Sequence, residues 1–168
     1  MNSRQSRQTG GYGRSRNAAP AVRTIPTPRK QPHPYRGSEG NHDPYWVTEA
    51  AEQVANDCRE LPPTQLRRFF SEVKGLARQL DLLTSQDKGD ARRLEKGDAW
   101  ARIHPQFAML KSKVVYAAGR LGKKMPNAFV QFIVDHVAWV QSAEDFEVFL
   151  SHFEAVVGFH RYLTTAKG

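Results

Sequence analysis

The segment FAMLKSKVVYAAGR, residues 107–120, decides the fold that this sequence predicts. Its large apolar side chains recur every three or four residues, the spacing of one face of an α-helix. They are Phe107, Leu110, Val114 and Ala118, with Leu121 directly beyond the segment. A second face of the same predicted helix is basic, and it carries Lys113, Tyr116, Arg120 and Lys124. Such a face suits a phosphate backbone with an aromatic ring for stacking, although an ordinary solvated helix face has the same pattern.

Helical spacing continues through residues 43–168, where no segment alternates apolar and polar residues as a strand would. A helix is expected from Asp43-Pro44 until Leu61-Pro62-Pro63 ends it, and a second from the cap residue Thr64 to about Leu80. Residues 84–99 predict a loop that leads into a short exposed helix. Later helices are expected to begin or kink at Pro105, to open at Pro126, and to begin at Ser142 with Asp145 as a capping box. The predicted fold is therefore an all-α, compact bundle of about five helices.

A second basic face is predicted on the helix that follows Thr64. Arg67, Ser71, Lys74 and Arg78 share one side at helical spacing, and Glu72 is expected to point elsewhere. Together the two faces and their neighbours form the predicted RNA-binding set, which comprises Arg67, Arg68, Lys74, Arg78, Lys111, Lys113, Tyr116, Arg120, Lys123 and Lys124.

The formal charge of +8 is concentrated in the first 42 residues, which hold eight Arg and Lys residues against Glu39 alone. This segment is also rich in glycine and proline and poor in large apolar residues, a composition that disfavours folding. We therefore expect residues 1–42 to be a disordered basic tail and residues 43–168 to form one helical domain. The tail is interpreted either as an arm that contacts nucleic acid or as a solubilising extension without a fixed partner.

The sequence contains no recognisable catalytic or cofactor-binding motif, so no enzyme activity, metal or cofactor is expected. Its six histidines are predicted to be core or surface residues, and the single Cys58 excludes an internal disulfide. No apolar run is long enough to cross a bilayer, and the N-terminus lacks the apolar stretch of a signal peptide. A cytoplasmic protein is therefore expected.

Three blocks of the sequence, taken together, carry a family resemblance. They are TQLRRFFSEVK at residues 64–74, LKSKVVYAAGR at residues 110–120, and FLSHFEAVVGFHRY at residues 149–162. In order and spacing they resemble the small subunit of the type III-A CRISPR effector, the Csm complex, along most of residues 45–163. The basic tail lies outside this resemblance.

The resemblance implies a five-helix subunit without catalytic activity that acts in antiviral defence. Several copies would stack beside the guide CRISPR RNA and its paired target RNA, in contact with the backbone and large subunits of the complex. Base pairing would then provide sequence specificity, while the protein would contact the RNA backbone. Two other classes stay open, a stand-alone helical DNA- or RNA-binding protein and a nuclease with an unusual site. The near-neutral folded part argues against the first, and the scattered carboxylates argue against the second.

Overall fold

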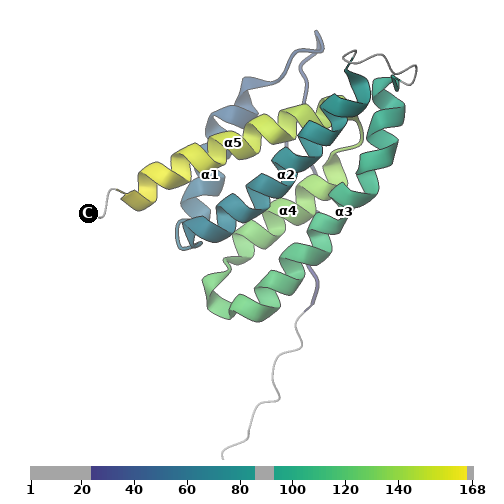
Figure 1. Ribbon diagram of the computed structural model, residues 1–168. Coiled ribbons are helices and arrows are strands. Elements are labelled where there is room, and N and C mark those ends of the chain that lie inside the picture. Colours follow the sequence, from purple (N-terminus) through teal and green to yellow (C-terminus); the bar gives the residue numbers. More distant parts are fainter. Residues whose placement is uncertain (1–23, 86–92, 166–168) are drawn as a thin grey trace, which may run out of the picture.

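Five α-helices and two 3-10 turns make up the regular structure of the protein in a computed structural model, which describes residues 24–85 and 93–165 (Figure 1). In chain order they are η1 (Pro44–Val47), α1 (Glu49–Asp57), α2 (Pro63–Thr84), α3 (Lys96–Leu121), η2 (Gly122–Lys124), α4 (Asn127–Trp139) and α5 (Ala143–Thr165). No β-strand occurs among these described residues, where β-structure is limited to an isolated bridge between Arg36 and His42. The predicted all-α bundle is confirmed.

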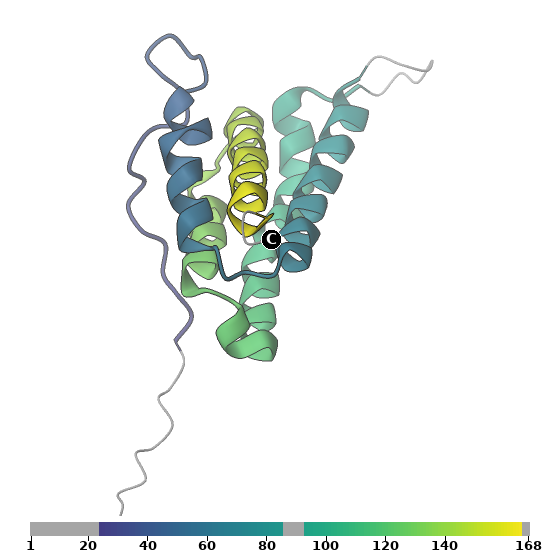
Figure 2. The same cartoon turned by 90° about the vertical axis from the view of Figure 1, so that its left-hand side faces the viewer.

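Helix α5 packs against both α1 and α2, and α3 packs against both α2 and α4 (Figures 1 and 2). The shared core is aromatic, because rings from α3, α4 and α5 meet at centroid distances of 5.2–6.2 Å. These rings belong to Phe107, Phe129, Phe132, Phe149 and Phe153, all of them buried. Burial of aromatic side chains on this scale dominates the energetics of a domain core.

The predicted first helix is interrupted. Asp43 caps the turn η1 by accepting a hydrogen bond from the Tyr45 amide at 2.9 Å, as expected for a residue before proline. The chain then leaves helical geometry at Thr48, where φ is −115° and ψ is −101°, and α1 begins only at Glu49. The predicted cap of α5 is present, since the Ser142 hydroxyl accepts from the Asp145 amide at 3.1 Å.

Helix α3 is longer than the sequence predicted, because it begins at Lys96 and passes through Pro105. The prediction of a loop and a short helix over residues 84–99 is wrong from Lys96 onward, because these residues form the first turn of α3. For residues 86–92 the prediction falls outside the described residues. Proline removes one backbone donor and disfavours a helix interior, but buried contacts outweigh this cost here. Trp100 and Ile103 before the proline, and Phe107 after it, are all buried. At its other end the helix stops at Gly122, whose φ of +56° favours glycine.

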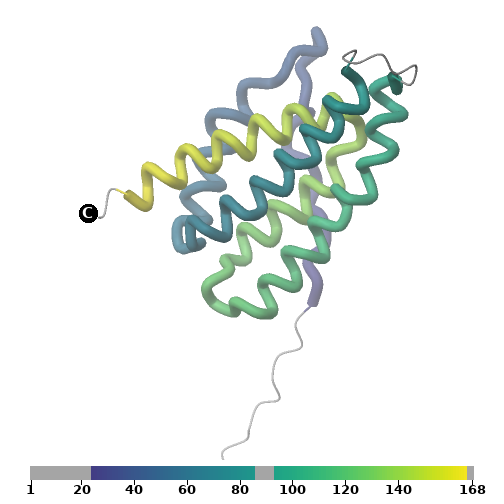
Figure 3. The backbone as a smooth tube through the Cα atoms, viewed as in Figure 1, coloured from purple at the N-terminus to yellow at the C-terminus, as the bar shows by residue number. Residues whose placement is uncertain are grey.

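Residues 24–42, here called the N-terminal strap, pack against the helices, and this corrects the predicted boundary at residue 42. The backbone trace shows the strap running behind the bundle, from the end where α3 joins α4 to the opposite end (Figure 3). Tyr35 is only 3% exposed and belongs to the core. The Trp46 indole N–H donates to the Pro34 carbonyl at 2.9 Å, which fixes the strap beside η1. The prediction of disorder for residues 1–23 falls outside the described residues.

None of the helices in the described part of the chain combines the length and apolar character that a membrane-spanning segment requires.

Deletion of residues 1–42 should lower the free energy of unfolding by several kcal/mol, because it exposes the Tyr35 site and leaves the buried Asp135 without Arg29. Loss of the hydrogen bonds that the Asp135 carboxylate accepts from Arg29 should account for about 1.5–3 kcal/mol of this decrease. Chemical denaturation of the isolated protein measures this, and deletion of residues 1–23 is the matched control because it leaves every described contact in place. Equal stability of the two truncated proteins would show that the strap contributes nothing to the fold.

Candidate nucleic-acid interface

The longest exposed basic array follows the side of α3 that borders α2. Its members recur at spacings of three and four, so they form one row, here called the α3 row: Arg102, Gln106, Met109, Lys113, Tyr116 and Arg120. Tyr116 is 72% exposed and Met109 is 54% exposed, so the row presents large side chains to solvent. Residues 99–134 contain six Arg and Lys residues and no Asp or Glu. The local charge of this surface is therefore strongly positive, although residues 43–168 are nearly neutral as a whole.

A carboxylate from the neighbouring helix does reach the α3 row. The Lys113 ammonium lies 2.5 Å from Glu72 of α2, across a shallow groove lined by Gly75, Gln79 and Gln106. The predictions that Glu72 points elsewhere and that no carboxylate interrupts the Lys113 face are therefore wrong. Helical spacing describes one helix at a time, whereas this ion pair arises because α2 and α3 lie side by side. Exposed pairs of this kind contribute little to stability, so the pair remains available for exchange with a phosphate.

The other predicted residues are divided among three sides of the bundle. Arg68 lies on the α3 side of α2, because it is one helical turn from Glu72. Arg67 lines a groove of about 380 Å³ between α2 and α5. Lys74 is placed 5.6 Å from the centre of the Phe70 ring, which packs on Phe153 of α5.

The remaining four include exposed Arg78 on α2, and half-buried Lys111 on the α4 side of α3, in line with Val115. Lys123 and Lys124 are exposed in η2 at the end of the bundle. Arg67 and Lys74 turn toward α5 and therefore do not face the α3 row. The whole set stays a prediction as regards RNA contact.

Two further arginines lie on these surfaces, and neither belongs to the set predicted from the sequence. Arg102 extends the α3 row, and it was missed because Pro105 was expected to begin or kink that helix. The spacing of four, three and four from Arg102 to Lys113 was the available signal. Arg161 lines the same groove as Arg67, a neighbour that only the packing of α5 on α2 could reveal.

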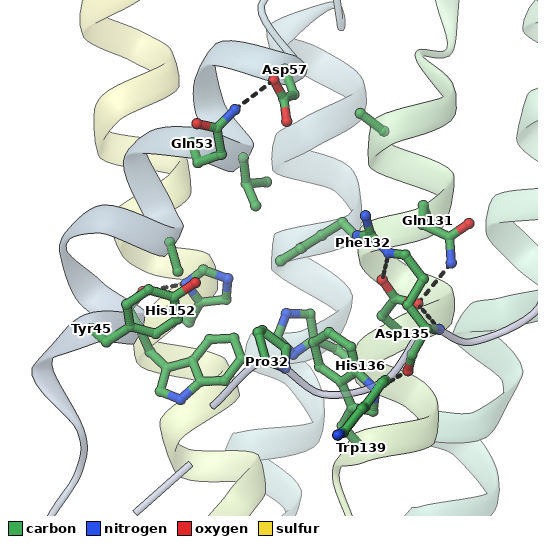
Figure 4. Close-up of a pocket in the computed structure, with 16 residues that line it drawn as sticks. Pro32, Tyr45, Gln53, Asp57, Gln131, Phe132, Asp135, His136, Trp139 and His152 are labelled. Atoms are coloured by element: carbon green, nitrogen blue, oxygen red, sulfur yellow. Dashed lines mark hydrogen bonds and ion pairs between the residues drawn. The ribbon is translucent and has the colours of Figure 1, made fainter. Parts of the chain in front are cut away.

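A cavity of about 320 Å³ lies on the far side of the bundle, between the strap, α1 and α4 (Figure 4). Trp46, Phe132, His136, Trp139 and His152 line it, together with Asp135. Asp135 is 1% exposed and fully engaged: its Oδ1 accepts from the Arg29 amide at 2.8 Å and from Gln131 at 2.7 Å, and its Oδ2 accepts from Arg29 Nε at 2.7 Å. A carboxylate held in this way secures the strap and is not placed as a general base.

The two histidines of this cavity are held in the neutral form. His152 Nδ1 donates to the Trp46 carbonyl, which leaves its Nε2 as a buried acceptor without a partner among the described residues. Burial lowers the pKa of His152 from 6.5 to about 4. Burial, reinforced by His152 and by Arg29, also holds the pKa of His136 well below its ordinary value. His136 Nδ1 shares a hydrogen bond of 2.5 Å with the Tyr35 hydroxyl, and burial raises the pKa of that phenol, so it stays protonated.

No three His, Cys, Asp or Glu side chains within residues 24–85 and 93–165 form a group that could hold a metal ion. The buried Cys58 packs in the core as a small apolar residue. The carboxylate of Asp135 and the imidazole of His136 in this cavity serve the docking of the strap.

Comparison with known proteins places these features in a family. The sequence model of the family described as Csm2 Type III-A matches residues 42–166, which include all five α-helices. No curated protein and no solved structure matches the chain.

Acidification from pH 7 to pH 5 should destabilise the protein through its buried histidines. In the unfolded chain these histidines have a pKa near 6.5 and take up protons on acidification, whereas folded His136 and His152 stay neutral. Their contribution to the free energy of unfolding is therefore complete above pH 6.5 and is lost as pH falls toward 4. His152 should account for about 2 kcal/mol of this loss between pH 7 and pH 5, and His136 should add to it in the same direction.

Urea denaturation at the two pH values, compared with His152→Asn, measures the effect. Asparagine can still donate to the Trp46 carbonyl but does not titrate, so the variant should lose about 2 kcal/mol less than the unmodified protein. An identical pH dependence in both proteins would contradict the buried neutral state of His152.

Proposed function

Because the chain belongs to the Csm2 Type III-A family, the small subunit of the type III-A Csm complex, we propose that it holds RNA in that CRISPR effector. In this proposal several copies stack along the duplex of guide CRISPR RNA and target RNA. Each copy contacts the RNA backbone through basic side chains and performs no catalysis itself. The other partners are the backbone and large subunits of the complex and further copies of the chain, in the cytoplasm and in antiviral defence.

The α3 row is the observation that supports this proposal most directly. Arg102, Lys113 and Arg120 extend over about 27 Å of helix, at 1.5 Å per residue, with no acidic residue on the same helix between them. A linear series of exposed cations at this spacing matches a phosphate backbone, which offers a series of negative charges along one direction. Tyr116 lies between Lys113 and Arg120 and is sufficiently exposed to stack on a base.

The chemistry of the row favours contact with the RNA backbone over base reading. Lys and Arg contacts to phosphates position a protein on nucleic acid, whereas recognition of sequence requires groups that are placed against base edges. In an RNA-guided complex the guide provides that recognition by base pairing. A subunit that repeats along the duplex needs to tolerate every sequence, and a row of flexible cations does so. Weak contacts in each copy add up when several copies bind one RNA.

Replacement of Lys113 and Arg120 by alanine should weaken retention of target RNA by the assembled complex. Loss of two phosphate contacts should lower the slope of log affinity against log salt by about 1.5 for each RNA-bound copy. Stability should change by no more than about 1 kcal/mol, since both side chains are exposed and only Lys113 has an ion pair.

The matched control removes two exposed arginines elsewhere, Arg36→Ala in the strap and Arg59→Ala after α1, and should leave RNA retention unchanged. A folded, assembled Lys113/Arg120 variant with unchanged affinity and salt slope would remove the α3 row from the proposed interface.

Substitution Glu72→Gln should have the opposite effect. It removes the carboxylate that neutralises Lys113 while preserving side-chain size, so the freed ammonium becomes a full phosphate contact. RNA affinity at low salt and the salt slope should both increase, the slope by at most about 0.9 for each RNA-bound copy. The same substitution in a Lys113→Ala background is the control and should have no effect. Unchanged affinity and an unchanged salt slope on Glu72→Gln alone would place this side of α3 outside the RNA-binding surface.

A further inference from the structure

We propose that the cavity between the strap, α1 and α4 binds a small neutral heteroaromatic molecule of one or two rings, which donates an N–H hydrogen bond to Nε2 of His152. The site lies on the far side of the bundle from the α3 row, and its walls belong to described parts of the chain. The proposal concerns a separate ligand and does not depend on the proposed role in RNA binding.

His152 supplies a hydrogen-bond acceptor that the fold leaves unused. Its side chain is 1% exposed, and its Nδ1 donates to the Trp46 carbonyl, so the neutral ring presents Nε2 as an acceptor. This Nε2 is buried and has no partner among the described residues, although His152 lines the cavity (Figure 4). Buried polar atoms in folded proteins are nearly always paired. An unpaired acceptor at a cavity therefore indicates that another molecule supplies the donor.

Aromatic rings surround this acceptor. The His152 ring packs edge to face with Trp46 at 5.3 Å and with Phe132 at 5.4 Å, measured between ring centres. The Trp139 ring lies 6.1 Å from that of Trp46, and it lines the same cavity. Flat aromatic molecules pack well in offset or edge-to-face contact with such rings. The walls therefore favour a planar ligand.

Water is a poor occupant of this inner wall, because a buried water typically makes about three hydrogen bonds. The indole N–H groups of Trp46 and Trp139 already donate to carbonyls of the strap. The Asp135 carboxylate accepts from Arg29 and Gln131. With these groups engaged, a single free acceptor in an aromatic wall suits a ligand that is apolar over most of its surface and carries one donor.

The size and charge of the cavity define the ligand further. A volume of about 320 Å³ accommodates a molecule of one or two rings, because it lies at the lower end of the range for ligand pockets. The lining contains two cations, Arg29 and Lys30, and two carboxylates, Asp57 and Asp135. These charges balance, and Arg29 is paired with Asp135. The cavity therefore favours a neutral molecule over an ion.

Nuclear magnetic resonance of the full-length chain, labelled with ¹⁵N, tests the proposal with indole as the probe. The chain contains three tryptophans, of which Trp46 and Trp139 line the cavity, whereas Trp100 packs on Phe107 and Phe146 in the core. Indole should shift the side-chain N–H resonances of Trp46 and Trp139 and leave that of Trp100 in place. The shifts should saturate with a Kd below about 1 mM, as expected for a ligand of this size.

Benzofuran is the matched control ligand, because it has the shape of indole with an oxygen in place of the N–H group. It should bind about tenfold more weakly, since it cannot donate to His152 Nε2. The variant His152→Phe removes the acceptor and should bind the two ligands equally.

A pair of substitutions on α4 locates the site. Ala128 lines the cavity, so Ala128→Phe should fill it and weaken indole binding at least about tenfold. Ala138→Phe is the control, because Ala138 is also half-buried on α4 but does not line the cavity, and it should leave binding unchanged.

The proposal is overturned if indole produces no saturable shift of Trp46 and Trp139, if Trp100 shifts equally, or if Ala128→Phe retains full affinity. Equal binding of indole and benzofuran to the unmodified protein would also overturn it, because the cavity would then be apolar space without a specific acceptor. This last comparison needs no variant and decides the matter even where a substitution prevents folding. RNA retention through Lys113 and Arg120 is measured separately, so the proposed function stands or falls on its own variants.

Discussion

The buried carboxylate of Asp135 is the constraint on which the N-terminal half of this structure depends. A charge with 1% exposure on α4 requires a partner, and the strap supplies it through Arg29. Once Arg29 is in place, Tyr35 reaches His136, the Pro34 carbonyl receives the Trp46 indole, and η1 follows directly after the strap. The backbone carbonyl of Trp46 in turn accepts a hydrogen bond from Nδ1 of His152 in α5. The Arg29–Asp135 ion pair thus connects the strap to α4, and the hydrogen bonds of Trp46 extend this connection to η1 and α5.

Much of the fold follows from the sequence because it depends on local patterns. The apolar stripes of Leu66 to Leu80 and of Phe107 to Val114 are buried as their spacing predicts, and the Asp43 and Ser142 caps are formed. The strap could not be predicted in the same way. Its composition is that of a disordered segment, and its docking depends on donors and a carboxylate more than 100 residues away in α4. Composition measures what a segment can bury by itself, whereas this segment is held by another element's side chains.

The candidate interface shows a similar division. Helical spacing identified Lys113, Tyr116 and Arg120 as one exposed row, and the structure extends it backward to Arg102 because buried contacts carry α3 through Pro105. Spacing could not show that Glu72 of α2 pairs with Lys113, or that Arg67 turns toward Arg161 on α5. These are properties of helix packing, and they place a principal row on α3 with separate basic sites around it.

Photocross-linking of RNA to the assembled complex tests the central claim most directly, because it records contacts without any substitution. The complex is purified with its guide and target RNA, irradiated and digested, and the cross-linked peptides of this subunit are identified by mass spectrometry. The account predicts cross-links along α3, above all at Tyr116, which is 72% exposed within the α3 row. Cross-links confined to α1 and to the cavity beneath the strap, with none on α3, would contradict it.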